Sequence, residues 1–87
     1  MDVPYDLLRA ARVLLDIEAR DLAKMAGVSK RSLVRIEARE TVKLETMLRV
    51  QRALEQAGIE FLPETGEQGP GIRIQKGKIG KPRPQDE

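Results

Sequence analysis

The chain contains no cysteine, histidine or tryptophan, and Tyr5 and Phe61 are its only aromatic residues. Without cysteine, neither a disulfide nor a thiolate metal site can form. Without histidine, the chain lacks the commonest general base and the commonest metal ligand. A core with so few aromatic rings has to be built from aliphatic side chains, which favours packed helices over a sandwich of sheets. We therefore expect a mainly α protein with no metal, no cofactor and no enzymatic activity.

Long apolar runs are also absent. No segment is apolar over a length that would span a bilayer, and the first residues lack the apolar segment of a signal peptide. We therefore expect a cytoplasmic protein without a membrane partner. With 87 residues the chain holds one small domain, whose core is marginal for an independent monomer, so self-association is expected.

The charges are nearly balanced overall but unevenly distributed. The chain has 16 basic and 14 acidic residues, and this net charge of +2 says little about a partner. Residues 30–43 hold five cations against two anions, and residues 72–87 hold five more, opposed only by Asp86 and Glu87. Two basic segments of this kind are compatible with binding to a polyanion such as DNA.

Apolar residues recur at helical spacing in four segments, which are predicted to be helices: residues 4–15, 19–26, 30–38 and 44–57. Gly27 supplies a left-handed cap after the second helix, and Ser29 is a favourable N-cap for the third. We expect Leu44 to begin the buried stripe of the fourth helix, and Met25 and Met47 to fill the core.

The third predicted helix has two unlike faces. Leu33 and Ile36 point inward, and the opposite side carries three cations and a valine: Lys30, Arg31, Val34 and Arg35. A helix that presents cations outward and is braced from behind suits the major groove of DNA.

A different pattern follows Gly58. Residues 59–62 resemble a short strand that Pro63 ends, and residues 72–74 alternate in the same way, which predicts a β-hairpin with a loop near residues 63–71. The last residues are polar and rich in glycine and proline, and are predicted to be a disordered basic tail. This tail is either a solubilising end or an arm that attracts phosphates. The chain therefore divides into a helical domain (residues 1–58), a hairpin (59–75) and a tail (76–87).

The first hairpin strand has two interpretations. It pairs only within its own hairpin, or its edge also pairs with the same strand of a second chain. Because an isolated hairpin is marginal in water, we favour the second interpretation. It assigns four residues to a homodimer interface: Ile59, Glu60, Phe61 and Leu62.

Within residues 19–38 the sequence has the pattern of two short helices around a glycine turn: Leu22-Ala23, then Ala26-Gly27-Val28-Ser29, then Leu33 and Ile36-Glu37. Together with its flanks, at about residues 4–75, the chain resembles the lambda-repressor-like (Xre/Cro) helix-turn-helix family. The resemblance implies a compact four-helix domain that places its third helix in the major groove of double-stranded DNA. Members of this family usually bind as dimers on a two-fold operator.

The resemblance also implies which residues contact DNA. Its motif positions imply base contacts by Lys30, Arg31, Ser32 and Arg35. An arginine fork binds guanine O6 and N7 together, whereas lysine makes a less directional contact. Phosphate contacts, which fix the register without distinguishing bases, are implied for Arg20, Ser29, Arg39, Thr41 and Lys43.

The chain departs from the family pattern at two places. Glu18 and Ala19 stand where many members have a serine or threonine cap followed by a glutamine that binds phosphate. Ala38 and Arg39 stand where an asparagine-glycine pair often closes the third helix. A left-handed conformation of Arg39 would cost on the order of 1 kcal/mol.

The sequence therefore predicts a sequence-specific DNA-binding regulator, a homodimeric repressor that occupies its operator in the bacterial nucleoid. The alternative is a helix-turn-helix module that binds a protein partner, as an antiactivator or an antitoxin, with weak or no DNA binding; Glu18 and Ala19 favour it. An enzyme would need paired carboxylates or an activated lysine, and the 14 acidic residues are scattered.

Overall fold

The computed structural model describes residues 3–78. These form four helices followed by a two-stranded antiparallel hairpin: α1 (Tyr5–Leu14), α2 (Ala19–Ala26), α3 (Lys30–Glu37), α4 (Leu44–Gln56), β1 (Ile59–Leu62) and β2 (Gly71–Ile74). The predicted mainly α fold is confirmed, and each element agrees with its predicted bounds to within one residue at either end. Most of the predicted basic tail, residues 79–87, lies outside the described residues.

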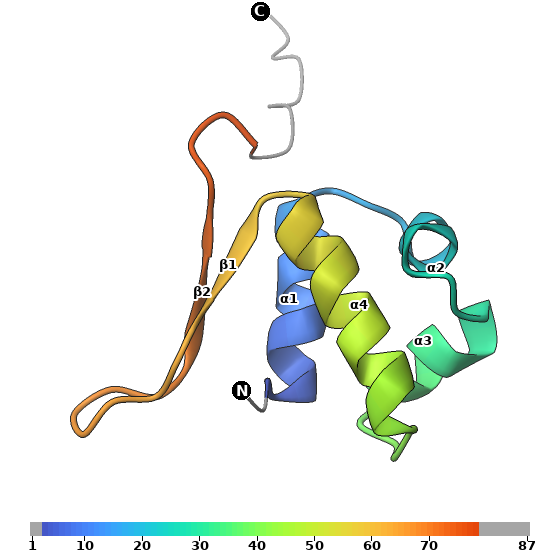
Figure 1. The fold of residues 1–87 in the computed structure, drawn as a ribbon, viewed down its shortest axis with the longest axis horizontal. Coiled ribbons are helices and arrows are strands. Elements are labelled where there is room, and N and C mark those ends of the chain that lie inside the picture. Colours follow the sequence, from blue (N-terminus) through green and yellow to red (C-terminus); the bar gives the residue numbers. More distant parts are fainter. Residues whose placement is uncertain (1–2, 79–87) are drawn as a thin grey trace, which may run out of the picture.

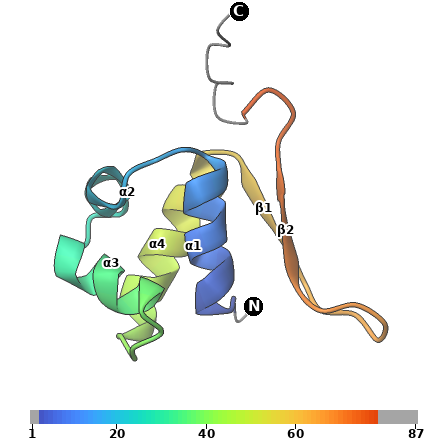
Figure 2. The ribbon, with the colours of Figure 1, turned by 180° about the vertical axis from the view of Figure 1, so that it is seen from behind.

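The helices form one body from which the hairpin projects. Figures 1 and 2 show α1 and α4 side by side at the centre, with α2 and α3 on one side and the hairpin on the other. The base of the hairpin packs against this centre, β2 against α1 and β1 against α4, while its loop extends away from all four helices. No helix among residues 3–78 has the length and apolar character to cross a membrane.

The core is aliphatic, as the composition predicts. All four helices contribute to its largest fully buried side chains, which are Leu8, Leu22, Leu33, Ile36, Val50 and Leu54. From β1, Ile59 and Phe61 add to this core, and Ile72 and Ile74 of β2 pack against it while half-buried. The hairpin is therefore attached to the body through one apolar face.

Two expectations about the core are wrong. Leu44 is 61% exposed because it is the first residue of α4, where the helix begins. Met25 is 51% exposed because the buried face of α2 consists of Leu22, Ala23 and Ala26, and Met25 lies beside that face. The prediction for Met47 is confirmed, since only 8% of it is exposed.

Left-handed backbone follows each of the first three helices. Gly27 ends α2 with φ 70°, as predicted, and this conformation has no steric penalty for glycine. Arg39, which follows α3, has φ 63°. It therefore adopts the left-handed conformation, at a cost of about 1 kcal/mol of strain. Asp16, between α1 and α2, has φ 58°, which the sequence pattern did not indicate.

Candidate nucleic-acid interface

The outer face of α3 is set by a cap at its start and by its apolar side. The Oγ of Ser29 accepts a hydrogen bond from the backbone N–H of Ser32 at 3.0 Å, which confirms Ser29 as the N-cap. Leu33 and Ile36 are fully buried. Because the helix has 3.6 residues per turn, burial of these two side chains turns the opposite side to solvent. The residues exposed there are Lys30, Arg31, Val34 and Arg35.

The far end of α3 is held by an ion pair with α1. Arg12 donates from Nε to Glu37 Oε2 at 2.6 Å and from Nη2 to Glu37 Oε1 at 2.9 Å. Its Nη1 donates to the carbonyl oxygen of Ile17 at 2.8 Å. The two side chains are 17% and 15% exposed, so water screens the pair only in part.

This pair favours the charged form of Arg12 and fixes the direction of α3. The hydrogen bond to Glu37 raises the pKa of Arg12, and this effect exceeds the opposing effect of burial. A two-bonded fork between guanidinium and carboxylate fixes orientation as well as distance. Sequence reasoning missed this contact. A weak signal existed, since Arg12 follows Leu8 by four residues and Glu37 follows Leu33 by four, placing each charge beside an apolar face.

The residues predicted to contact phosphates do not form one cluster. Ser29 and Lys43 line a shared hollow between the starts of α3 and α4. Arg20 pairs with Glu18 at 3.3 Å, and the guanidinium of Arg39 donates to Asp6 at 2.9 Å. Both ion pairs are exposed, so they are weak and leave these arginines accessible to another anion. Thr41 is exposed in the segment between α3 and α4.

The hollow between α3 and α4 also contains residues that the sequence did not single out. Thr46 and Arg49 line it together with Ser29, Ser32 and Lys43. The guanidinium of Arg49 donates to Glu45 at 3.0 Å and to the carbonyl oxygen of Gly27 at 3.4 Å, which links α4 to the turn before α3.

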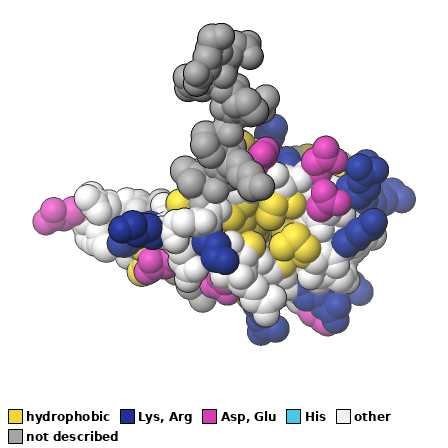
Figure 3. All heavy atoms as spheres, turned by 90° about the horizontal axis from the view of Figure 1, so that it is seen from above, with side chains coloured by type: hydrophobic (Ala, Val, Ile, Leu, Met, Phe, Trp, Pro, Cys, Tyr) yellow, Lys and Arg dark blue, Asp and Glu magenta, His cyan; other side chains and the backbone are white. Residues whose placement is uncertain are grey.

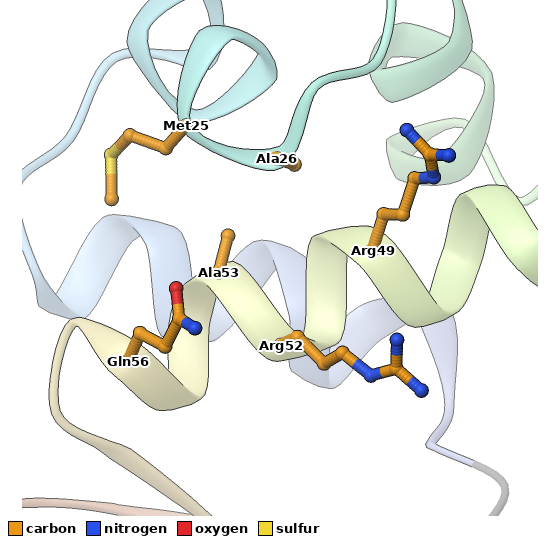
Figure 4. Close-up of a pocket in the computed structure, with 6 residues that line it drawn as sticks. All are labelled: Met25, Ala26, Arg49, Arg52, Ala53 and Gln56. Carbon is orange, nitrogen blue, oxygen red and sulfur yellow. The ribbon is translucent and has the colours of Figure 1, made fainter.

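A second hollow lies between α2 and α4. Figure 4 shows Met25 and Ala26 facing Ala53, with Arg49, Arg52 and Gln56 along the same helix α4. In the view of Figure 3, Lys and Arg side chains crowd the end of the molecule where α2 and α3 lie, away from the hairpin loop. On this face, Lys and Arg side chains therefore gather, with some acidic side chains among them, around the two helices of the predicted motif.

The four residues predicted to form a dimer interface divide into two kinds. Ile59 and Phe61 are buried in the core of their own chain, while Glu60 is exposed and Leu62 half-buried. Strand β1 pairs with β2 in the register Ile59↔Ile74 to Leu62↔Gly71. The within-chain hairpin is therefore present, and pairing with a second chain stays a prediction.

Among residues 3–78 there is no group of three or more acidic side chains arranged to hold a metal ion. The site is a solvent-facing helix with cations and one apolar side chain, which can make hydrogen bonds and ion pairs with an extended polyanion.

Comparison with known proteins agrees with this geometry. The model of a helix-turn-helix family matches residues 8–61, which cover α2, α3, α4 and most of α1 and β1. No curated protein matches the chain. The matched region includes both Arg12 and Glu37 as well as the whole outer face of α3.

Proposed function

The chain belongs to the helix-turn-helix family of DNA-binding regulators, in its lambda-repressor-like (Xre/Cro) form, and from this we propose that it binds a specific operator through α3. The observation that carries the proposal is the arrangement of α3 itself. Lys30, Arg31 and Arg35 are exposed on one side, while the other side is buried and tied to α1 through Glu37. An α-helix of this width fits the major groove of B-form DNA.

Two kinds of contact follow from the residue types. Arg31 and Arg35 have the fork that matches O6 and N7 of guanine, and Lys30 and Ser32 offer single donors to base edges. The residues proposed for phosphates, Arg20, Ser29, Arg39, Thr41 and Lys43, would fix the register of α3 along the groove. Affinity would then come largely from phosphates, and discrimination among sequences from the outer face of α3.

The regulator acts as a homodimer in this proposal and represses transcription by occupying its operator. A two-fold dimer requires a symmetric site with half-sites about one helical turn apart. The hairpin supports such an assembly because, among residues 3–78, its sheet has two strands and each leaves one edge without a paired strand. As a DNA-binding regulator, the protein would work at the nucleoid in the bacterial cytoplasm.

Selection of duplexes from a random-sequence DNA pool, followed by affinity measurements, tests this function. Arg31→Ala or Arg35→Ala should weaken binding to the selected duplex by about 1–3 kcal/mol and relax the preference at one base pair. Arg52→Ala is the matched control, since Arg52 is an exposed arginine on α4 outside the proposed contacts. Equal weakening on every sequence would show that Arg31 and Arg35 contact only phosphates. Retention of no duplex at all would reject the function.

A protein-binding role is the second candidate. Glu18 is the N-cap of α2 but its side chain makes no cap hydrogen bond, and Ala19 has no side-chain donor for a phosphate. The start of α2 therefore lacks the usual means of anchoring DNA. Saturable binding of a protein partner together with failure to retain any duplex would favour this antiactivator or antitoxin role.

A further inference from the structure

Val34 is an apolar side chain in the middle of a charged surface. It is 52% exposed on the outer face of α3, four residues after Lys30 and three after Arg31, so it shares their side of the helix. The other large hydrophobic residues exposed among residues 3–78 are Val13, Met25 and Leu44, and all of them lie on other helices.

The fold itself gives no reason for a valine at this position. The buried side of α3 is complete with Leu33 and Ile36, and both are already enclosed. A β-branched residue lowers helix propensity because its χ1 is restricted, so alanine would suit an exposed position of an eight-residue helix better. Val34 therefore has a lower helix propensity than alanine would have at this position, which lies in the centre of the proposed DNA-contacting face.

Binding of α3 in the major groove would remove Val34 from water. Its side chain has no hydrogen-bonding atom, so a favourable contact with the groove requires an apolar group on the DNA. The C5 methyl of thymine is the apolar group that base edges present in the major groove, and apolar side chains are known to contact it.

We propose that Val34 contacts the C5 methyl group of a thymine, so that α3 selects a T·A pair beside the base pairs contacted by Lys30 and Arg31. The inference rests on the proposed DNA-binding function and adds to it a residue that selects one base without a hydrogen bond. Because Val34 lies between Lys30 and Arg31 on the outer face, the selected thymine would be a direct neighbour of their base contacts.

Replacement of thymine by uracil tests the inference, since it removes only the methyl group. The probe is the duplex selected from a random-sequence pool, with each thymine replaced by deoxyuridine in turn. Burial of one methyl group corresponds to about a fourfold change in affinity. Wild-type protein should lose about fourfold at one thymine of each half-site, and Val34→Ala should bind the thymine and uracil duplexes equally.

Val13→Ala is the matched control, an exposed valine on α1, and should keep the full sensitivity to uracil. Val34→Ala should melt at or above the wild-type temperature, because alanine has the higher helix propensity. Uracil sensitivity that persists in Val34→Ala, or that is absent from the wild type at every thymine, would overturn the role of Val34 and leave the DNA-binding function intact. Failure of the wild type to retain any duplex would remove both.

Discussion

The helical body and the hairpin differ in how many other elements each one packs against. In the body, the four helices enclose six large, fully buried aliphatic side chains between them. The hairpin buries Ile59 and Phe61 at its base, and its loop projects into solvent away from the helices. Each helix of the body is therefore held in place by packing on several sides, whereas the hairpin is held by packing on one face.

This difference separates two tasks. Discrimination among base pairs needs side chains held in a fixed direction, and α3 meets this need through its buried face and the Arg12–Glu37 ion pair. Assembly needs a surface that stays accessible, and the hairpin has one in its strand edges. The surface proposed to contact DNA therefore lies on the helical body, which is packed on several sides. The surface proposed for dimerisation lies on the hairpin, which is packed on one face.

The largest expected effect tests the body. Ile36→Ala removes a fully buried side chain of α3 and should lower the free energy of unfolding by about 2–5 kcal/mol, through lost burial and the cavity left behind. Leu62→Ala, at a half-buried position of β1, should cost clearly less. Urea unfolding followed by circular dichroism measures both. Equal losses would show that the hairpin is as firmly held as the body.

The second prediction concerns the link between α1 and α3. Arg12→Ala leaves Glu37 largely buried with only the more distant Arg9 beside it, at 4.0 Å, and should lower the free energy of unfolding by about 1–3 kcal/mol. It should also weaken binding to the selected duplex, because α3 loses its fixed direction. Arg12→Lys keeps the charge but not the fork, so it should recover only part of both effects. Full recovery by lysine would show that charge alone holds α3.

The pH dependence of this link follows from the pKa of Arg12. A cation whose pKa is raised by folding contributes its stability below its ordinary pKa and loses it only as pH rises through the raised value. For arginine both values lie in strong alkali. The stability difference between wild type and Arg12→Ala should therefore be constant from neutral to moderately alkaline pH, as urea unfolding at several pH values would check.

The features of the fold that the sequence predicts are those that depend on residues close together in the chain. Gly27 and Ser29 end and begin helices through conformations and hydrogen bonds made with their own neighbours, so these boundaries follow from the sequence alone. The exposure of Lys30, Arg31 and Arg35 follows in the same way from the spacing of the apolar residues beside them.

Contacts between distant residues were beyond such reasoning. The Arg12–Glu37 pair joins residues 25 positions apart, and no local pattern specifies it. The exposure of Met25 depends on how α2 rotates against α4, because a shift by one position decides whether it enters the core. Whether β1 also pairs with the same strand of a second chain depends on contacts between two copies, which no pattern within one strand specifies.

A third prediction concerns the strain stored where α3 ends. Arg39→Gly should raise the free energy of unfolding by about 1 kcal/mol, because glycine adopts φ 63° without steric cost. The lost ion pair with Asp6 is exposed and weak, so it should offset little of this gain. Asp16→Gly, at φ 58°, should gain less, since aspartate tolerates the left-handed region better than arginine. Thermal melts of the two variants would compare them, and a gain at Asp16 exceeding that at Arg39 would contradict this account.

The smallest effect belongs to the hairpin. Glu60 and Arg73 face each other across β1 and β2, with 3.6 Å between charged atoms, and both side chains are mostly exposed. Glu60→Lys places like charges opposite each other and should lower stability by about 0.2–1 kcal/mol, and the double variant E60K/R73E should recover it. These effects are measured by urea unfolding at two protein concentrations. If β1 pairs only within its chain, E60K/R73E should recover the lost stability to the same extent at both protein concentrations. A loss that shrinks on dilution and is not recovered by the reversed pair would mean that a second chain also contacts Glu60, and the hairpin would then be held from two sides, as the body is.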